Sequence, residues 1–159
     1  MHLVFKNKPG LIIAVGANIG TSSIPLAIEF PNYEFVAFEP QRTVYHHLVS
    51  NVFLNQLQNI TLNRNAASDF DEKLMQVPFI DIFENYTGSV SLDKNVMLKR
   101  SKIEGVAEPS AYTKNYDVVE VVKLDDVNVS NVSLIKVDVE GMELFVLKSA
   151  KKILQDNSF

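Results

Sequence analysis

Two glycines and an acid occur at the spacing that nucleotide-binding folds use for a cofactor. The apolar run Leu11–Val15 is followed by Gly16-Ala17-Asn18-Ile19-Gly20. A second apolar run, Phe35–Phe38, ends roughly twenty residues later in Glu39-Pro40. Glycines let the backbone approach a ligand closely, and an acid at the end of the second strand accepts hydrogen bonds from ribose hydroxyls. The pattern predicts a site for an adenosine-type cofactor.

The glycine spacing narrows the choice of cofactor. The Gly16-x-x-x-Gly20 pattern differs from the G-x-G-x-x-G pattern that packs a pyrophosphate against a helix. It therefore disfavours NAD, FAD and a nicotinamide-dependent oxidoreductase, and favours S-adenosylmethionine, which has no pyrophosphate. The simpler alternatives are that the glycines only form a turn and that Glu39 is a solvated residue at the end of its strand.

A second group of acids, Asp138-Val139-Glu140-Gly141-Met142-Glu143, follows the apolar run that begins at Val132. Carboxylates at the end of a buried strand are costly unless they are paired, hydrated or functional. If the strand continued through Glu140, Asp138 and Glu140 would point the same way and share a proton, a metal or a substrate hydroxyl. Alternatively, Glu140 interacts with the start of the next helix. We interpret Asp138 and Glu140 as the catalytic candidates.

Two further sets of polar residues give less specific indications of function. Asp69 and Asp71 follow the third expected strand, where they would either hold an adenine amino group or belong to a polar turn. The histidines His2, His46 and His47 have no second group of metal ligands nearby, so we expect no metal site.

Alternating strands and helices must position these groups. The expected strands are Leu11–Val15, Glu34–Phe38, Asn59–Asn63, Leu74–Phe79, Gly88–Leu92, Tyr116–Leu124 and Val132–Val139, and the expected helices are Thr21–Phe30, Gln41–Leu54 and Met142–Leu154. This order predicts a Rossmann-like, doubly wound α/β fold with a mostly parallel sheet and its ligand at the carboxyl ends of the strands. The last helix is expected to bury Leu144, Leu147 and Leu154, with Val146 and Ala150 beside them.

Composition restricts the class of protein. The 159 residues fit one domain, and no apolar run reaches the roughly 20 residues that span a bilayer. A net charge of −4 disfavours nucleic acid as a partner. The absence of cysteine suits a reducing compartment, so we expect a cytoplasmic protein. The basic cluster Lys99, Arg100 and Lys102 is either a solvated loop or an anion-binding edge.

Taken together, the motifs resemble the FkbM family of S-adenosylmethionine-dependent methyltransferases. The resemblance extends over about residues 9–152. Its pieces are Val15–Gly20, Ala37–Pro40, Leu48-x-x-Asn51-x-x-Leu54-Asn55, Asn65–Asp69, Leu124–Val127 and Ile135–Glu143, which occur in the order of the family.

The resemblance implies a role for each motif. Gly16, Ala17, Asn18 and Gly20 would cradle the methionine end of S-adenosylmethionine, Glu39 with Pro40 its ribose, and Ala67, Ser68 and Asp69 its adenine. Asp138 and Glu140 would face the transferred methyl and the acceptor. The implied reaction is O-methylation of a hydroxyl on a sugar, glycan or small natural product. Residues Tyr86, Ser89, Ser91 and Tyr112 are candidates for contact with that acceptor.

The chain departs from the family pattern at two places. Ala14 stands where the family usually has an acid that orders the methionine end of the cofactor. The sequence also stops at Phe159, before the fifth strand of the usual order, so strand four would have an open edge. A homodimer partner, a rearranged insert or missing sequence would cover this edge. These departures favour the alternative function, a non-catalytic or truncated remnant with weak cofactor binding or none.

Overall fold

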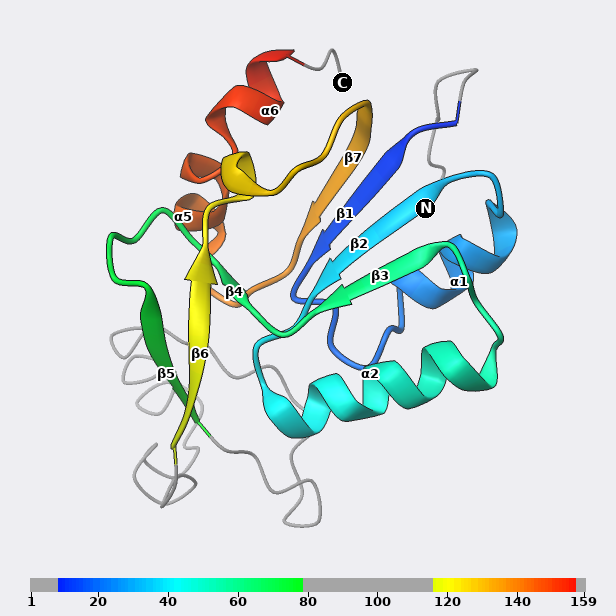
Figure 1. Cartoon of the computed structure of the whole chain (residues 1–159), viewed down its shortest axis with the longest axis horizontal. Coiled ribbons are helices and arrows are strands. Elements are labelled where there is room, and N and C mark those ends of the chain that lie inside the picture. Colours follow the sequence, from blue (N-terminus) through cyan, green and yellow to red (C-terminus); the bar gives the residue numbers. More distant parts are fainter. Residues whose placement is uncertain (1–8, 79–115, 157–159) are drawn as a thin grey trace.

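The computed structural model describes residues 9–78 and 116–156. Its central sheet has four parallel strands in the order β3-β2-β1-β7: β1 (Leu11–Val15), β2 (Glu34–Phe38), β3 (Ile60–Asn63) and β7 (Val132–Val137) (Figure 1). Val15 pairs with Phe38 on one side and with Val137 on the other. The last residues of three strands therefore lie side by side, and the segments that follow them meet at one edge. The predicted α/β fold is confirmed.

Helices pack on both faces of this sheet because the strands alternate their apolar side chains. Helices α1 (Ser23–Glu29) and α2 (Arg42–Leu54) pack against one face, where they contact Ile12 and Ala14 of β1. Helices α5 (Glu143–Lys148) and α6 (Lys151–Asp156) pack against the other face, with Ile13 and Val15. No helix within residues 9–78 and 116–156 has the length and apolar character needed to cross a membrane.

The C-terminal helix differs from the prediction. It is divided into α5 and α6, and its buried residues are Val146, Ala150 and Ile153, whereas Leu144, Leu147 and Leu154 are exposed. The expected buried face was therefore right for Val146 and Ala150 and wrong for the three leucines.

Two polar residues account for the break between α5 and α6. The Ser149 hydroxyl donates to the Val146 carbonyl (2.7 Å) at the end of α5. The Asp125 carboxylate accepts the amides of Lys152 (3.0 Å) and Ile153 (3.1 Å) at the start of α6. These contacts satisfy backbone groups that a continuous helix would have paired internally.

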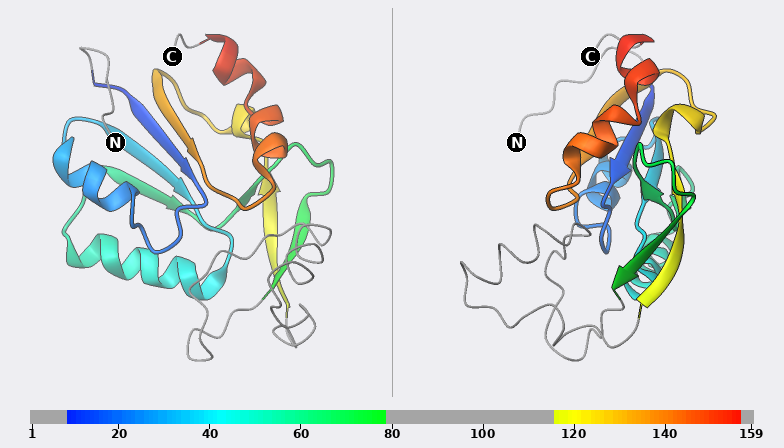
Figure 2. Two further views of the ribbon diagram at one scale, coloured as in Figure 1. Left: turned by 180° about the vertical axis from the view of Figure 1, so that it is seen from behind. Right: turned by 90° about the vertical axis from the view of Figure 1, so that its left-hand side faces the viewer.

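A second sheet, which the sequence did not indicate, stands beside the carboxyl ends of the central strands (Figures 1 and 2). Its order is β4-β6-β5, with β4 (Ala66–Ala67) parallel to β6 (Tyr116–Val122) and β5 (Leu74–Pro78) antiparallel to β6. Its own small core contains Ala66, Val77 and Val119. After β6 the chain forms a short 3-10 helix, η2 (Leu124–Asp126).

Several expectations lie outside the described residues. These are the strand Gly88–Leu92, the basic cluster at residues 99–102, and the acceptor candidates Tyr86, Ser89, Ser91 and Tyr112.

Candidate cofactor-binding site at the strand ends

The turn after β1 needs its two glycines for different contacts. Gly16 and Gly20 have φ angles of +72° and +94°, in the left-handed region that side chains disfavour. A Cβ atom on Gly16 would collide with the Asp138 carbonyl oxygen, and one on Gly20 would collide with the Ile24 side chain. The loop is therefore packed tightly between the end of β7 and helix α1.

Glu39 is buried at the end of β2 and contacts the glycine loop directly. The residue is 6% exposed, and its carboxylate accepts hydrogen bonds from the amides of Asn18 (2.9 Å) and Gln41 (3.0 Å). Burial raises the pKa of Glu39 above its ordinary value, and these two hydrogen bonds offset part of that effect. The interpretation of Glu39 as a solvated strand end is thus excluded. A carboxylate has about four acceptor positions, so two remain for a ligand.

Asn51 on α2 is a second support of the glycine loop, and the sequence analysis gave it no role. Its side-chain amide donates to the Ile19 carbonyl (2.8 Å). The side chain of Asn18, which has a φ of +53°, accepts the Ile19 amide (2.7 Å). The sequence signal that could have indicated Asn51 is its position three residues after Leu48, which places it at the edge of the buried face of the helix.

The position of Ala14 explains why the loop depends on these two residues. Ala14 is buried in an apolar cluster with Ala17, Ile24 and Leu48, beneath the loop. A carboxylate at this position would lose its hydration among apolar groups. Glu39 and Asn51 hold the loop from the β2 and α2 sides instead.

A pocket that is partly open to solvent lies beside the loop. Its lining comes from both sheets and from the segment before α5: Val15, Gly16, Phe38, Pro40, Asn65, Ala66, Ala67, Ser68, Met75, Val139 and Met142. Most of these side chains are apolar, which suits the faces of a planar ring.

The three predicted adenine-binding residues differ in their positions. Ala67 and Ser68 line the pocket, whereas Asp69 is half-buried and lies outside the lining. The Ser68 amide donates to the Val122 carbonyl (3.0 Å), but its buried hydroxyl has no partner among the described residues. A buried hydroxyl without a partner is uncommon and marks a position where a ligand would be favourable. Asp71 is exposed and forms an ion pair with Lys123 (3.5 Å).

Asp138 and Glu140 do not share a strand face. Strand β7 ends at Val137, and Glu140 has a left-handed φ of +52°, so the alternation that was expected to align the two carboxylates is absent. The Asp138 side chain is exposed and is paired with Lys136 (3.0 Å). Its backbone amide donates to the Val15 carbonyl (3.0 Å), which keeps Asp138 beside the glycine loop.

A third acid of this segment, Glu143, binds the backbone before α5. Its two carboxylate oxygens both lie 3.0 Å from the Gly141 amide, and this contact holds the pKa of Glu143 below its ordinary value.

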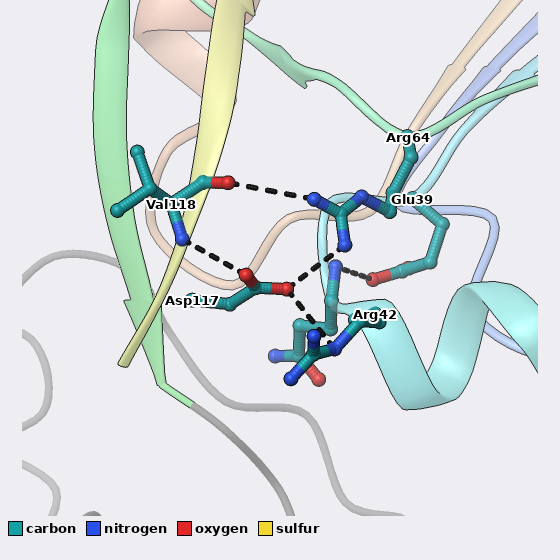
Figure 3. A network of polar contacts seen from close by, with 6 residues as sticks. Glu39, Arg42, Arg64, Asp117 and Val118 are labelled. Carbon is teal, nitrogen blue, oxygen red and sulfur yellow. Dashed lines mark hydrogen bonds and ion pairs between the residues drawn. The ribbon is translucent and has the colours of Figure 1, made fainter. Parts of the chain in front are cut away.

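A charged network joins the rim of the site to the second sheet (Figure 3). Asp117, near the start of β6, accepts a hydrogen bond from Arg64 Nη1 (2.9 Å) and forms an ion pair with Arg42 Nε (3.5 Å). Arg64 also donates to the Val118 carbonyl (3.4 Å). None of these residues was singled out from the sequence, because the acid and the arginines are far apart along the chain.

The sheet order, the glycine loop and the buried acid at the end of β2 define a Rossmann-like α/β protein with a pocket at the strand ends. Residues 14–158 match the model of the methyltransferase FkbM domain. The chain belongs to this family, and the resemblance of the motifs is confirmed.

Two curated relatives carry the name methyltransferase. The chain is 31% identical to methyltransferase sdnD of Sordaria araneosa over 86% of its own length and 59% of that protein. It is 25% identical to methyltransferase 1 of Beauveria bassiana (strain ARSEF 2860) over 86% of its length and 57% of that protein. The chain thus spans less than three fifths of these relatives.

A solved structure, M. jannaschii TYW2 in complex with AdoMet, is similar over a smaller region. The match covers 43% of this chain and 31% of that chain, with 32% identity and a TM-score of 0.36.

Proposed function

We propose that this chain binds S-adenosylmethionine at the carboxyl ends of β1 and β2 and methylates a hydroxyl of a sugar, glycan or small natural product. The observation that carries the proposal is the Glu39 carboxylate, buried beside an apolar pocket and bonded to the glycine loop. Membership of the FkbM family supports the reaction class, and the apolar pocket supports the cofactor.

The residues present fit this cofactor. The remaining acceptor positions of Glu39 would take the ribose hydroxyls. The apolar walls around Pro40, Ala67 and Met142 would take the adenine ring, and the Ser68 hydroxyl would gain a hydrogen-bond partner there. The methionine end would lie against the backbone of the glycine loop, at Gly16, Ala17, Asn18 and Gly20. Asp69 would act only from outside the pocket lining.

The protein's part in the reaction is to align the acceptor and receive its proton. The bound cofactor supplies an electrophilic methyl group. Residues beside the glycine loop would align an acceptor hydroxyl with this methyl group and accept the hydroxyl proton as the methyl is transferred. Asp138 is our candidate base because its backbone is tied to β1 beside the glycine loop, with Glu140 as the alternative.

Calorimetric titration with S-adenosylhomocysteine tests the cofactor site, with NAD as the control ligand. Micromolar binding of S-adenosylhomocysteine alone supports the proposal. Absence of binding by a folded chain contradicts it, and favours the non-catalytic remnant that the apolar surroundings of Ala14 would suit.

We also propose a second copy of the chain as a partner at β7. In the part of the chain that the structure describes, β7 pairs with β1 on one side only. Leu144 and Leu147 of α5, the helix that follows this strand, are exposed. An open strand edge near exposed leucines is a surface that a homodimer would cover.

A further inference from the structure

The pocket is formed jointly by the two sheets, so its shape depends on how they meet. Gly16, Phe38 and Pro40 belong to the central sheet and the turns that follow its strands. Ala67 and Met75 belong to the second sheet. A displacement of the second sheet would therefore move one wall of the pocket relative to the other.

The carboxyl end of β6 is attached by backbone pairing and apolar contacts. Val121 and Val122 pair with β4, and Val122 packs against the core cluster that contains Phe38 and Leu124. Glu120 and Lys123 make polar contacts at this end, with Asn65 and Asp71, but Glu120 and Asp71 are exposed, so backbone pairing and apolar packing hold this end of the strand.

The other end of β6 is attached through Asp117. This carboxylate is only 16% exposed and lies between Arg64, which follows β3, and Arg42, which begins α2 (Figure 3). The residue before Arg42 is Gln41, whose amide donates to Glu39. Asp117 is thus connected to the same turn that holds the proposed ribose acid.

Met75 lies between these two attachments. It pairs with Val119 of β6, two residues from Asp117 and two from Val121. At roughly 3.3 Å per residue, the attachments are about 13 Å apart along the strand. The position of the Met75 side chain in the pocket therefore depends on both of them.

We infer that Asp117 is a positioning residue for the cofactor: its ion pairs with Arg42 and Arg64 dock the second sheet so that Met75 closes the pocket wall. The expected effect of Asp117 on cofactor affinity rests on the proposed function, in which the pocket receives the adenosine. Asp117 does not itself line the pocket, so its effect passes through Met75.

Methyl NMR of the full chain labelled with [methyl-¹³C]methionine tests this inference directly. The chain has four methionines, and two of them, Met75 and Met142, line the pocket from different elements. Met75→Leu and Met142→Leu variants assign the two signals. In Asp117→Asn we expect the Met75 methyl signal to shift or broaden without ligand, while the Met142 signal stays in place. We also expect binding of S-adenosylhomocysteine to weaken roughly three- to tenfold.

Matched variants distinguish a positioning role of Asp117 from the general effect of removing a negative charge from β6. Glu120→Gln removes the same charge from the same strand and keeps a side-chain oxygen that can accept from Asn65, so it should leave Met75 unchanged. Asp117→Glu keeps the charge and should restore much of the Met75 signal and the affinity. If Asp117→Asn fails to fold, Arg42→Gln removes one of the two ion pairs and the same readouts apply.

The result that overturns the inference is an unshifted Met75 signal in folded Asp117→Asn, or an equal shift in Glu120→Gln. A failure of the proposed function is recognisable separately, because neither methionine of the unmutated chain would then respond to S-adenosylhomocysteine. The ligand-free comparison of Met75 still tests the role of Asp117 in that case.

Discussion

At the scale of single residues, the site depends on hydrogen bonds to the backbone of the glycine loop. Glu39→Gln replaces one carboxylate oxygen by a donor, which would face an amide of Asn18 or Gln41 that needs an acceptor. Loss of a hydrogen bond to a charged group costs about 1.5–3 kcal/mol, so we expect affinity for S-adenosylhomocysteine to fall by about one to two orders of magnitude. Titration calorimetry measures this loss, and circular dichroism checks the fold. Unchanged affinity would mean that the ribose binds elsewhere.

The raised pKa of Glu39 predicts opposite effects of pH on stability and on binding. Burial favours the protonated form in the folded chain, so this group's contribution to stability is full below pH 4.5 and is lost as pH rises through the folded pKa. Binding of the ribose needs acceptor oxygens, so affinity should rise over the same interval. Denaturant unfolding and calorimetry at several pH values measure the two trends. Both should be absent in Glu39→Gln, and persistence of either trend there would assign it to another group.

Asn51 offers a test of the loop that leaves the proposed ribose acid intact. Asn51→Ala leaves the Ile19 carbonyl without its donor, and we expect a loss of about 1 kcal/mol of unfolding free energy together with weaker binding. Asn55→Ala is the matched control, because the Asn55 side chain donates to the Asn51 carbonyl on the exposed surface of the same helix. Urea unfolding compares the two variants. Equal effects would show that the Asn51 contact has no special importance for the loop.

At the scale of elements, the C-terminal helices give the clearest contrast between adjacent side chains. Ile153 is 8% exposed in the core beneath α6, whereas Leu154 is 39% exposed. We expect Ile153→Ala to cost about 2 kcal/mol or more, and Leu154→Ala less than about 1 kcal/mol. Denaturant unfolding of both variants measures the difference. A larger loss of unfolding free energy for Leu154→Ala would instead support the continuous helix, with Leu154 buried, that the sequence pattern indicated.

The sequence predicted the parts of the fold that depend on local patterns. Strands β1 and β2 occur at the expected residues, and α2 lies within the expected helix Gln41–Leu54. The break between α5 and α6 could not be predicted, because Asp125 caps α6 from 27 residues away. The second sheet was missed for the same reason, since β4 and β6 are distant in sequence.

The sequence predicted the residues of the candidate site that belong to short local motifs. It did not predict the residues whose role depends on contacts between distant segments. Gly16, Gly20 and Glu39 lie together as expected, and Ala67 and Ser68 line the neighbouring pocket. The expected alignment of Asp138 with Glu140 required a strand that continued through Glu140, whereas β7 ends at Val137. The contacts of Asn51 and Asp117 each join segments more than thirty residues apart, so local spacing could place Asn51 at the edge of its helix face but could not name the partner of either residue.

At the scale of the whole molecule, the proposed dimer depends on the edge of β7. Exposed backbone groups on a strand edge, with Leu144 and Leu147 exposed on the helix that follows, favour pairing with another chain. We expect light scattering after size exclusion to give twice the chain mass of 17.9 kDa at micromolar concentration. Leu144→Lys with Leu147→Lys should return the monomer, because both side chains are exposed and their charge would be buried in the dimer.

Ile28→Lys on α1 is the control for this dimer, because it adds one positive charge at an exposed apolar side chain on the opposite face of the sheet. This variant should remain dimeric. A monomeric unmutated chain would contradict the proposed partner without bearing on the cofactor site, since the glycine loop, Glu39 and the pocket lie at the carboxyl ends of the strands and not along the β7 edge. A dimer that survives the double leucine substitution would place the interface on another surface of the chain.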